Sequence, residues 1–255
     1  MGISVVIPLF GRDKYREQLF EFERACIAKQ HYAKIELLAV EQYIDKPLWC
    51  QSEFPTYAKH IAIKDGTQFC LSWCMNVGAR EARYDKLLLT GADMVFDTGY
   101  FEKIDEFLTQ YPCGVGFNRL VYMSKLGTAD YIKTGYQAEL KPECVEKVVR
   151  PHVWTAGGVT VHRKDVFFDT LGGMNENYFA YGKDDKDLYL RMKQVYRPFK
   201  MVDYEIRHLY HKARIPRPPE NEDTYNLVRH DPAAVSKKLV EAGMGKRESR
   251  TIIQI

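Results

Sequence analysis

Short apolar runs alternate with amphipathic segments along most of the chain. Buried-strand patterns occur at Ile3–Ile7, Ile35–Val40, Ile61–Ile63, Lys86–Thr90, Gly114–Phe117 and Gly158–His162. Helical patterns occur at Lys14–Lys29, Leu71–Arg83, Tyr100–Leu108, Lys164–Thr170, Asp185–Val195 and, last, Pro232–Ala242. Because strands that alternate with helices form parallel sheets, the pattern predicts an α/β fold. We expect a mostly parallel, doubly wound sheet with helices on both faces.

Two stretches break this alternation. Tyr122–Arg150 contains glycine and proline at irregular positions and is predicted to be a long loop or β-ribbon over an acceptor-binding surface. Pro216–Asp223 is rich in proline and acidic residues and is predicted to be a flexible connection. We therefore expect a main domain at 1–215 and a C-terminal extension at 216–255, helical and packed on the same domain.

The stretch Trp154–Arg191 holds the richest candidate chemistry. Its string YGKDD runs directly into the helical pattern DLYLRM, which places Asp184 and Asp185 at a helix N-terminus. Free backbone N–H groups and the helix dipole stabilise negative charge there, and an ionised carboxylate suits a general base. For Asp184 or Asp187 alone, a helix-capping role is an equal alternative.

Glycine pairs and aromatic residues surround these carboxylates. The pairs are Gly157-Gly158 and Gly172-Gly173, and the aromatics are Tyr178, Phe179 and Tyr181. Flat rings beside carboxylates suit the hydroxyl-rich surface of a sugar. The segment resembles the C-terminal part of the galactosyltransferase domain in β-1,4-galactosyltransferases and chondroitin-type polymerases, which reads W-G-G-E-D-D-D-L. The corresponding string here is Y-G-K-D-D-K-D-L, Tyr181–Leu188.

The N-terminal half is similar to the same group. ISVVIPLFGR resembles the V-I-I-P-x-x-N-R opening of family 2 glycosyltransferases, and Met75–Ala82 matches their L-N-V-G-x-x-x-A helix. The resemblance covers about Ile3–Arg214 and implies the GT-A fold. It also implies a set of donor-binding residues: Pro8, Arg12, Asn76, Asp93, Gly157 and Gly158.

A metal site is implied at the end of the predicted strand Lys86–Thr90. The string TGADM falls where the family has its DXD motif, with Gly91 at the first acidic position and Asp93 at the last. The resemblance therefore implies Asp93 as a metal ligand; the alternative is a turn residue that closes the strand. Two acidic side chains normally hold the divalent ion in this family, so the glycine weakens the metal assignment without removing it.

Two histidines provide further candidate ligands. The string Ile206-Arg207-His208 matches the I-R-H string that supplies a histidine ligand in galactosyltransferases, and His211 follows at H-x-x-H spacing. His208 is the first choice and His211 the second, with a structural role for either as the alternative. Oxygen and nitrogen ligands of this kind suit Mn²⁺ or Mg²⁺.

Composition adds few constraints. The chain has 255 residues and a net charge of +3, values that suit one large globular domain. Its six cysteines form no C-x-x-C pair, so we expect reduced thiols and a cytoplasmic protein. No signal peptide or membrane-length apolar run is recognised, which favours a bacterial or bacteriophage source over anchored Golgi enzymes. Nothing in the sequence predicts an oligomeric state.

The resemblance implies an inverting glycosyltransferase that moves a sugar from a UDP-sugar to an acceptor hydroxyl. Asp185 would be the general base, and Asp184 would bind acceptor or donor hydroxyls. Trp154 and Tyr181 would stack on the acceptor sugar. The acceptor is expected to be a glycan or another hydroxyl compound.

Two alternatives stay open at this point. The first is a phage enzyme that glycosylates a hydroxymethylated or otherwise modified DNA base, which the slightly basic C-terminal part permits. The second is an inactive sugar-binding scaffold, motivated by Gly91 in place of the first acidic residue.

Overall fold

The computed structural model describes residues 2–11, 20–21, 25, 27–29, 34–64, 68–134, 141–149, 158–180, 182–211 and 218–251. Its centre is a six-stranded sheet with the order β3-β2-β1-β4-β9-β6. The strands are β1 (Ile3–Phe10), β2 (Ile35–Tyr43), β3 (Ala58–Lys64), β4 (Lys86–Leu89), β6 (Cys113–Val115) and β9 (Thr160–Arg163).

The register confirms a mostly parallel sheet. Strand β1 pairs in parallel with both β2 and β4, so that Ile3 lies beside Ile35 on one side and Lys86 on the other. Strand β9 runs antiparallel to its neighbours β4 and β6. The central strands are continuous apolar runs because both of their faces are covered, as in other α/β proteins.

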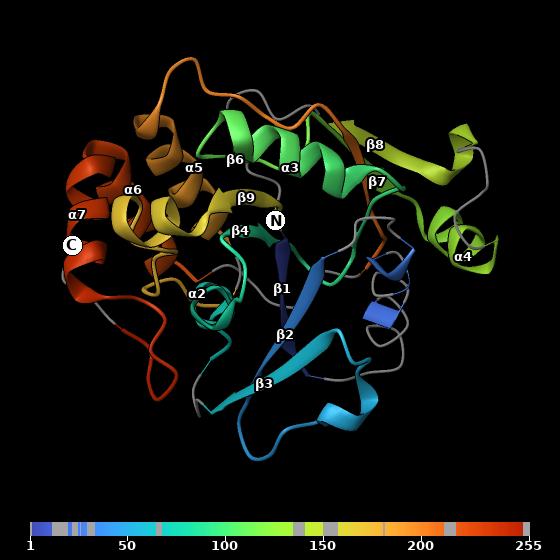
Figure 1. The fold of residues 1–255 in the computed structure, drawn as a ribbon, viewed down its shortest axis with the longest axis horizontal. Coiled ribbons are helices and arrows are strands. Elements are labelled where there is room, and N and C mark those ends of the chain that lie inside the picture. Colours follow the sequence, from blue (N-terminus) through green and yellow to red (C-terminus); the bar gives the residue numbers. More distant parts are fainter. Residues whose placement is uncertain are drawn as a thin grey trace.

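Helices cover this sheet and extend beyond its edge (Figure 1). They are α2 (Leu71–Glu81), α3 (Tyr100–Gln110), the short π-helix η3 (Val166–Thr170), α5 (Asp184–Val195), α6 (Glu220–His230) and α7 (Pro232–Ala242). Helix α2 packs on β1 and β2, and α3 packs on β9. Helices α5, α6 and α7 pack on one another at one side of the molecule (Figure 1).

A second, four-stranded sheet lies beside the first and was not predicted. Its order is β5-β10-β7-β8, formed by β5 (Met94–Val95), β10 (Glu205–His208), β7 (Arg119–Met123) and β8 (Val145–Val149). Strands β7 and β8 pair antiparallel. They lie at the two ends of Tyr122–Arg150, the segment predicted to be a long loop or β-ribbon. Between them are α4 (Lys125–Thr134) and the 3-10 turn η2 (Pro142–Cys144), where no helix was expected.

The predicted flexible connection is wrong over its acidic half. Glu220–Asp223 forms the first turn of α6, which begins directly after Pro219. Acidic side chains in a first turn interact favourably with the helix dipole, so this composition starts a helix. The predicted helix Lys14–Lys29 lies largely outside the described residues; those described within it at 20–21, 25 and 27–28 are helical.

Candidate functional site

Asp93, His208 and His211 come together beyond the C-terminal end of β4, and we call them the metal cluster. One ligand atom from each side chain lies within 4.8 Å of the others. The Asp93 carboxylate lies 2.9 Å from His211 Nε2 and 3.8 Å from His208 Nε2. The structure thus brings together all three residues that the sequence nominated, with His211 nearer to the carboxylate than the first choice, His208.

The smaller sheet sets this geometry. Strand β10 pairs with β5 so that His208 lies opposite Met94, and the Leu209 amide donates to the Asp93 carbonyl oxygen at 2.9 Å. His208 also lies beside Tyr122 of β7, and the two rings are 4.8 Å apart. Backbone pairing of the short strand β10 therefore positions the two histidines beside Asp93, beyond the end of β4.

The electrostatics of the cluster favour a charged carboxylate. Burial raises the pKa of Asp93, but the charges of His208 and His211 and a hydrogen bond from His211 outweigh it and lower the pKa below its usual value. All three side chains keep partial exposure, at 17 to 31%. An ionised oxygen ligand and two imidazoles are therefore all partly accessible.

Gly91, which stands at the first acidic position of the motif that the sequence resembles, leaves room for Asp93. A Cβ atom at position 91 would lie 2.8 Å from the Asp93 Oδ1 atom, closer than real Cβ contacts. Any side chain at 91 would force the Asp93 carboxylate to move. The glycine is therefore part of the geometry that turns Asp93 toward the histidines.

The expected carboxylate pair lies at the start of α5. Asp184 and Asp185 occupy its first turn, as predicted, after Lys183 in the left-handed conformation with φ of 83°. The Asp185 Oδ1 atom accepts a hydrogen bond from the Lys186 amide at 2.8 Å. Burial, followed by the charge of Asp185, raises the pKa of Asp184 to about 7.

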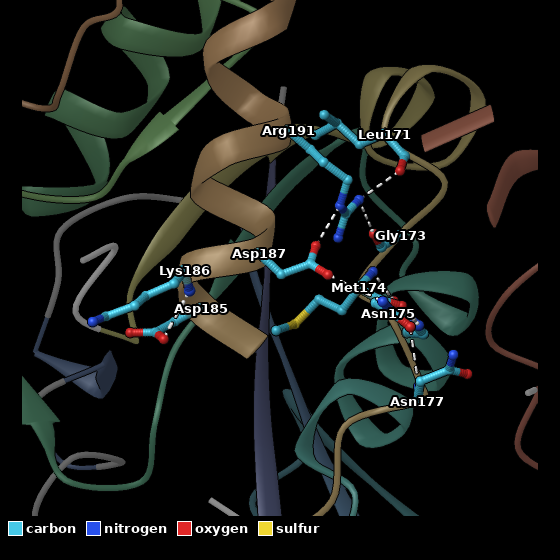
Figure 2. Close-up of polar contacts among 10 residues, drawn as sticks. Leu171, Gly173, Met174, Asn175, Asn177, Asp185, Lys186, Asp187 and Arg191 are labelled. Atoms are coloured by element: carbon cyan, nitrogen blue, oxygen red, sulfur yellow. Dashed lines mark hydrogen bonds and ion pairs between the residues drawn. The ribbon is translucent and has the colours of Figure 1, made fainter. Parts of the chain in front are cut away.

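Asp187 has a different role from its neighbours. It is fully buried, pairs with the Arg191 Nε atom at 2.5 Å and accepts from Asn175 Nδ2 at 3.0 Å. Arg191 also donates to the carbonyl oxygens of Leu171 and Gly173. Figure 2 shows Asp187 pointing toward this group and Asp185 pointing to the other side of α5. For Asp187, the capping alternative is therefore replaced by a buried ion pair.

The Asn76 side chain, which was predicted to contact the donor, makes hydrogen bonds within the fold. This side chain is fully buried and donates to the Met174 carbonyl oxygen at 2.8 Å and to Glu176 Oε1 at 2.9 Å. Its own oxygen accepts from the Met174 amide at 2.8 Å. In this arrangement Asn76 fixes the loop that precedes α5, so its influence on a donor would be indirect.

Only some of the other residues that were predicted to bind the donor or the acceptor lie among the described residues. Pro8 is buried near the C-terminal end of β1, and Gly158 precedes β9. A Cβ at Gly158 would lie 3.8 Å from the side chain of Met94, the residue that follows Asp93 of the metal cluster. The remaining predictions lie outside the described residues: Arg12, Trp154, Gly157 and Tyr181.

Several residues that shape the site were not found from the sequence. Lys183 is held by an ion pair with Glu222 at 2.7 Å and lies 4.5 Å from the Tyr225 ring, both on α6. Two further residues of this kind are Glu176 and Tyr122. Their partners are distant in the chain, so no local pattern in the sequence identifies them.

Part of the chain that holds these features matches a known family. Residues 147–231 match a family model described as the N-terminal domain of galactosyltransferase. The match includes the carboxylates of α5 and both histidines of the metal cluster, and it agrees with the resemblance seen in the sequence. No curated protein matches the chain.

Solved structures show that the fold is that of GT-A glycosyltransferases. TarS 1-349 from S. aureus, solved with UDP-GlcNAc, has a TM-score of 0.60 at 11% identity, covering 94% of this chain and 70% of that one. GalNAc-T7, solved with UDP, GalNAc and Mn²⁺, has a TM-score of 0.58 at 12% identity, covering 92% of this chain and 51% of that one. This chain therefore spans about half of the GalNAc-T7 chain. The fold and the family match together support a transferase.

Within the part of the chain that the structure describes, no helix is both long enough and apolar enough to cross a membrane.

Proposed function

We propose that this chain is an inverting glycosyltransferase that moves a sugar from a UDP-sugar to an acceptor hydroxyl. The metal cluster carries the proposal, because Asp93, His208 and His211 converge at the end of a central strand. Ligands of open α/β sheets bind outside such strand ends. The same fold holds UDP-GlcNAc in TarS and UDP with Mn²⁺ in GalNAc-T7.

The cluster fits a divalent cation by chemistry and by size. One carboxylate and two imidazoles are ligands that Mn²⁺ accepts, and the carboxylate is biased toward its charged form. Ligand atoms that lie about 2 Å from an ion are about 3 to 4 Å from one another. The separations of up to 4.8 Å therefore need only small side-chain movements. A bound ion would neutralise the charge that develops on the departing diphosphate.

Asp185 is the proposed general base. The acceptor oxygen bonds to the anomeric carbon, the bond from that carbon to the UDP oxygen breaks, and the acceptor proton passes to Asp185. Its position in the first turn of α5 and its bond from the Lys186 amide stabilise the ionised form that accepts this proton. Attack opposite the leaving group inverts the anomeric configuration.

Asp184 is proposed to bind sugar hydroxyls. Since its pKa is raised to about 7, it is partly protonated near neutral pH and donates as well as accepts hydrogen bonds. Neighbouring carboxylates in different protonation states divide the roles of base and hydroxyl ligand.

The remaining substrate contacts are proposed from the family resemblance. Arg12, Gly157 and Gly158 would contact the donor. Trp154 and Tyr181 would stack on the acceptor, for which we propose a glycan or another hydroxyl compound. No observation on the described residues favours DNA or an inactive scaffold.

A thermal-shift screen of UDP-sugars with and without MnCl₂ tests the proposal. A bound ligand raises the melting temperature in proportion to ln(1 + [L]/Kd), so a matching donor should stabilise the protein more when Mn²⁺ is present. Asp93→Asn should remove this extra shift. Asp203→Asn, an exposed carboxylate before β10, is the matched control and should retain it. Equal shifts with and without Mn²⁺ for every donor would argue against the metal site.

A further inference from the structure

The loop Gly172–Ala180, here the entry loop, leads toward the carboxylates at the start of α5. We propose that Gly243–Thr251, here the strap, positions the entry loop for catalysis, with Glu176 and Arg250 as the positioning residues that join the two. The part of this inference that concerns transfer rests on the proposed function.

Glu176 joins three separate segments. It is fully buried, and its Oε1 atom accepts from Asn76 Nδ2 at 2.9 Å and from the Gly245 amide at 2.8 Å. Its Oε2 atom accepts from the Thr251 amide at 2.6 Å. A buried carboxylate is stable only with such donors. One side chain therefore links α2, the entry loop and the strap.

The strap is also fixed directly to α2, beside which it runs after α7 (Figure 1). The Trp73 indole donates to the Lys246 carbonyl oxygen at 2.7 Å. The Arg80 Nε atom donates to the Met244 carbonyl oxygen at 3.0 Å. Because α2 packs on the central strands β1 and β2, these bonds tie the strap to the rigid part of the fold.

Arg250 connects the strap to Phe179, near the end of the entry loop. Its guanidinium carbon lies 4.0 Å from the centre of the Phe179 ring, within the range of a cation–π contact. On α6, Asn221 both donates to and accepts from the Phe179 backbone. The Ala180 amide donates to the Phe69 carbonyl oxygen at 2.7 Å. The strap thus provides one of three supports for the loop end.

The backbone between the loop and α5 needs such support. Ala180 and Lys183 have φ angles of 52° and 83°, which residues with side chains rarely adopt. Conformations of this kind persist only where the surroundings hold them. Without the strap, the turn would relax and move Asp185. A displacement of about 1 Å at a reacting group costs up to about 100-fold in rate.

Arg250→Ala and Glu176→Gln test the strap, with Arg247→Ala as the matched control. Arg247 lies in the same strap, carries the same charge and is exposed. We expect the first two variants to lower kcat about 10- to 100-fold while the donor KM changes by less than about threefold. Arg250→Lys should recover part of the loss, because an ammonium group also interacts with an aromatic face. Arg247→Ala should stay within about twofold of the unmodified chain.

Hydrogen exchange provides a readout that needs no activity. In Arg250→Ala, amides at 176–180 and 182–185 should exchange faster, with little change in the central strands. Absence of transfer by the unmodified chain would overturn the proposed function, whereas faster exchange in Arg250→Ala would still support the strap. Unchanged exchange would overturn the strap. So would a kcat of Arg250→Ala that equals that of Arg247→Ala.

Discussion

Asp185→Asn and Asp187→Asn make the same chemical change on one helix, and we expect opposite outcomes. Asp187 and Arg191 are both fully buried and paired at 2.5 Å. Asparagine at 187 removes the charge and turns an N–H donor toward either Arg191 or Asn175. Leaving one member of a buried pair without its partner costs about 3 to 5 kcal/mol.

The Asp185 substitution should have little effect on stability. Asp185 is partly exposed, and a charge in the first turn contributes about 0.3 to 1 kcal/mol through the helix dipole. Removing it also relieves repulsion with Asp184. We therefore expect a change within about 1 kcal/mol, together with a loss of transfer of about two to four orders of magnitude, the usual contribution of a general base.

Urea and thermal unfolding at pH 7, combined with transfer assays, measure both effects. In a chain of this size 1 kcal/mol corresponds to about 2 to 4 °C, so Asp187→Asn should melt roughly 6 to 20 °C lower. Asp185→Asn should melt within about 4 °C of the unmodified chain. An unchanged melting temperature for Asp187→Asn, or near-normal turnover for Asp185→Asn, would refute the assignment of roles.

Three further outcomes are expected. Gly91→Ala should weaken Mn²⁺ binding about 10- to 100-fold with little loss of stability, because the new Cβ displaces the Asp93 carboxylate. Calorimetric titration with Mn²⁺ measures this, and an unchanged affinity would contradict it. Alanine in place of either histidine of the metal cluster should lower Mn²⁺-dependent donor affinity, and a variant that keeps full affinity marks a histidine that is not a ligand. Because the pKa of Asp184 is raised, the folded chain holds the proton of this carboxyl more tightly than the unfolded chain does between about pH 4 and 7. Ionisation of Asp184 therefore destabilises the fold as pH rises through this window. Asp184→Asn should therefore gain more stability at pH 8 than at pH 5 in urea unfolding, and equal gains would disprove the shift.

The sequence predicted the central sheet because its strands are local and strongly patterned. Ile3–Ile7 and Ile35–Val40 are apolar runs that both fall inside long buried strands. The helix Pro232–Ala242 was predicted with its observed bounds, since Asp231 caps it and Gly243 ends it.

The smaller sheet was not predictable in the same way. Met94–Val95 is too short to show a period, and Glu205–His208 has no alternation that sets it apart. Gly127 lies inside α4 and weakens its helical pattern, although the glycine is needed where the helix contacts the Cys144 backbone. Pairing between distant segments, rather than local preference, forms this region.

The candidate site, too, was predicted only in part. Asp93, His208 and the α5 carboxylates were identified because family-like strings surround them. The functions of Asn76 and Glu176 were not, because their hydrogen bonds join residues far apart in the chain. A sequence shows which side chains are present but not which buried partners complete their hydrogen bonds.

NMR observation of the reaction with a UDP-sugar and a saccharide acceptor shows whether this chain is an inverting, metal-dependent glycosyltransferase. The spectra report UDP formation and the anomeric configuration of the product in one experiment. We expect Mn²⁺-dependent UDP formation with an inverted product, and loss of both in Asp93→Asn. Transfer that needs no divalent ion, or a product with retained configuration, would contradict the proposed function.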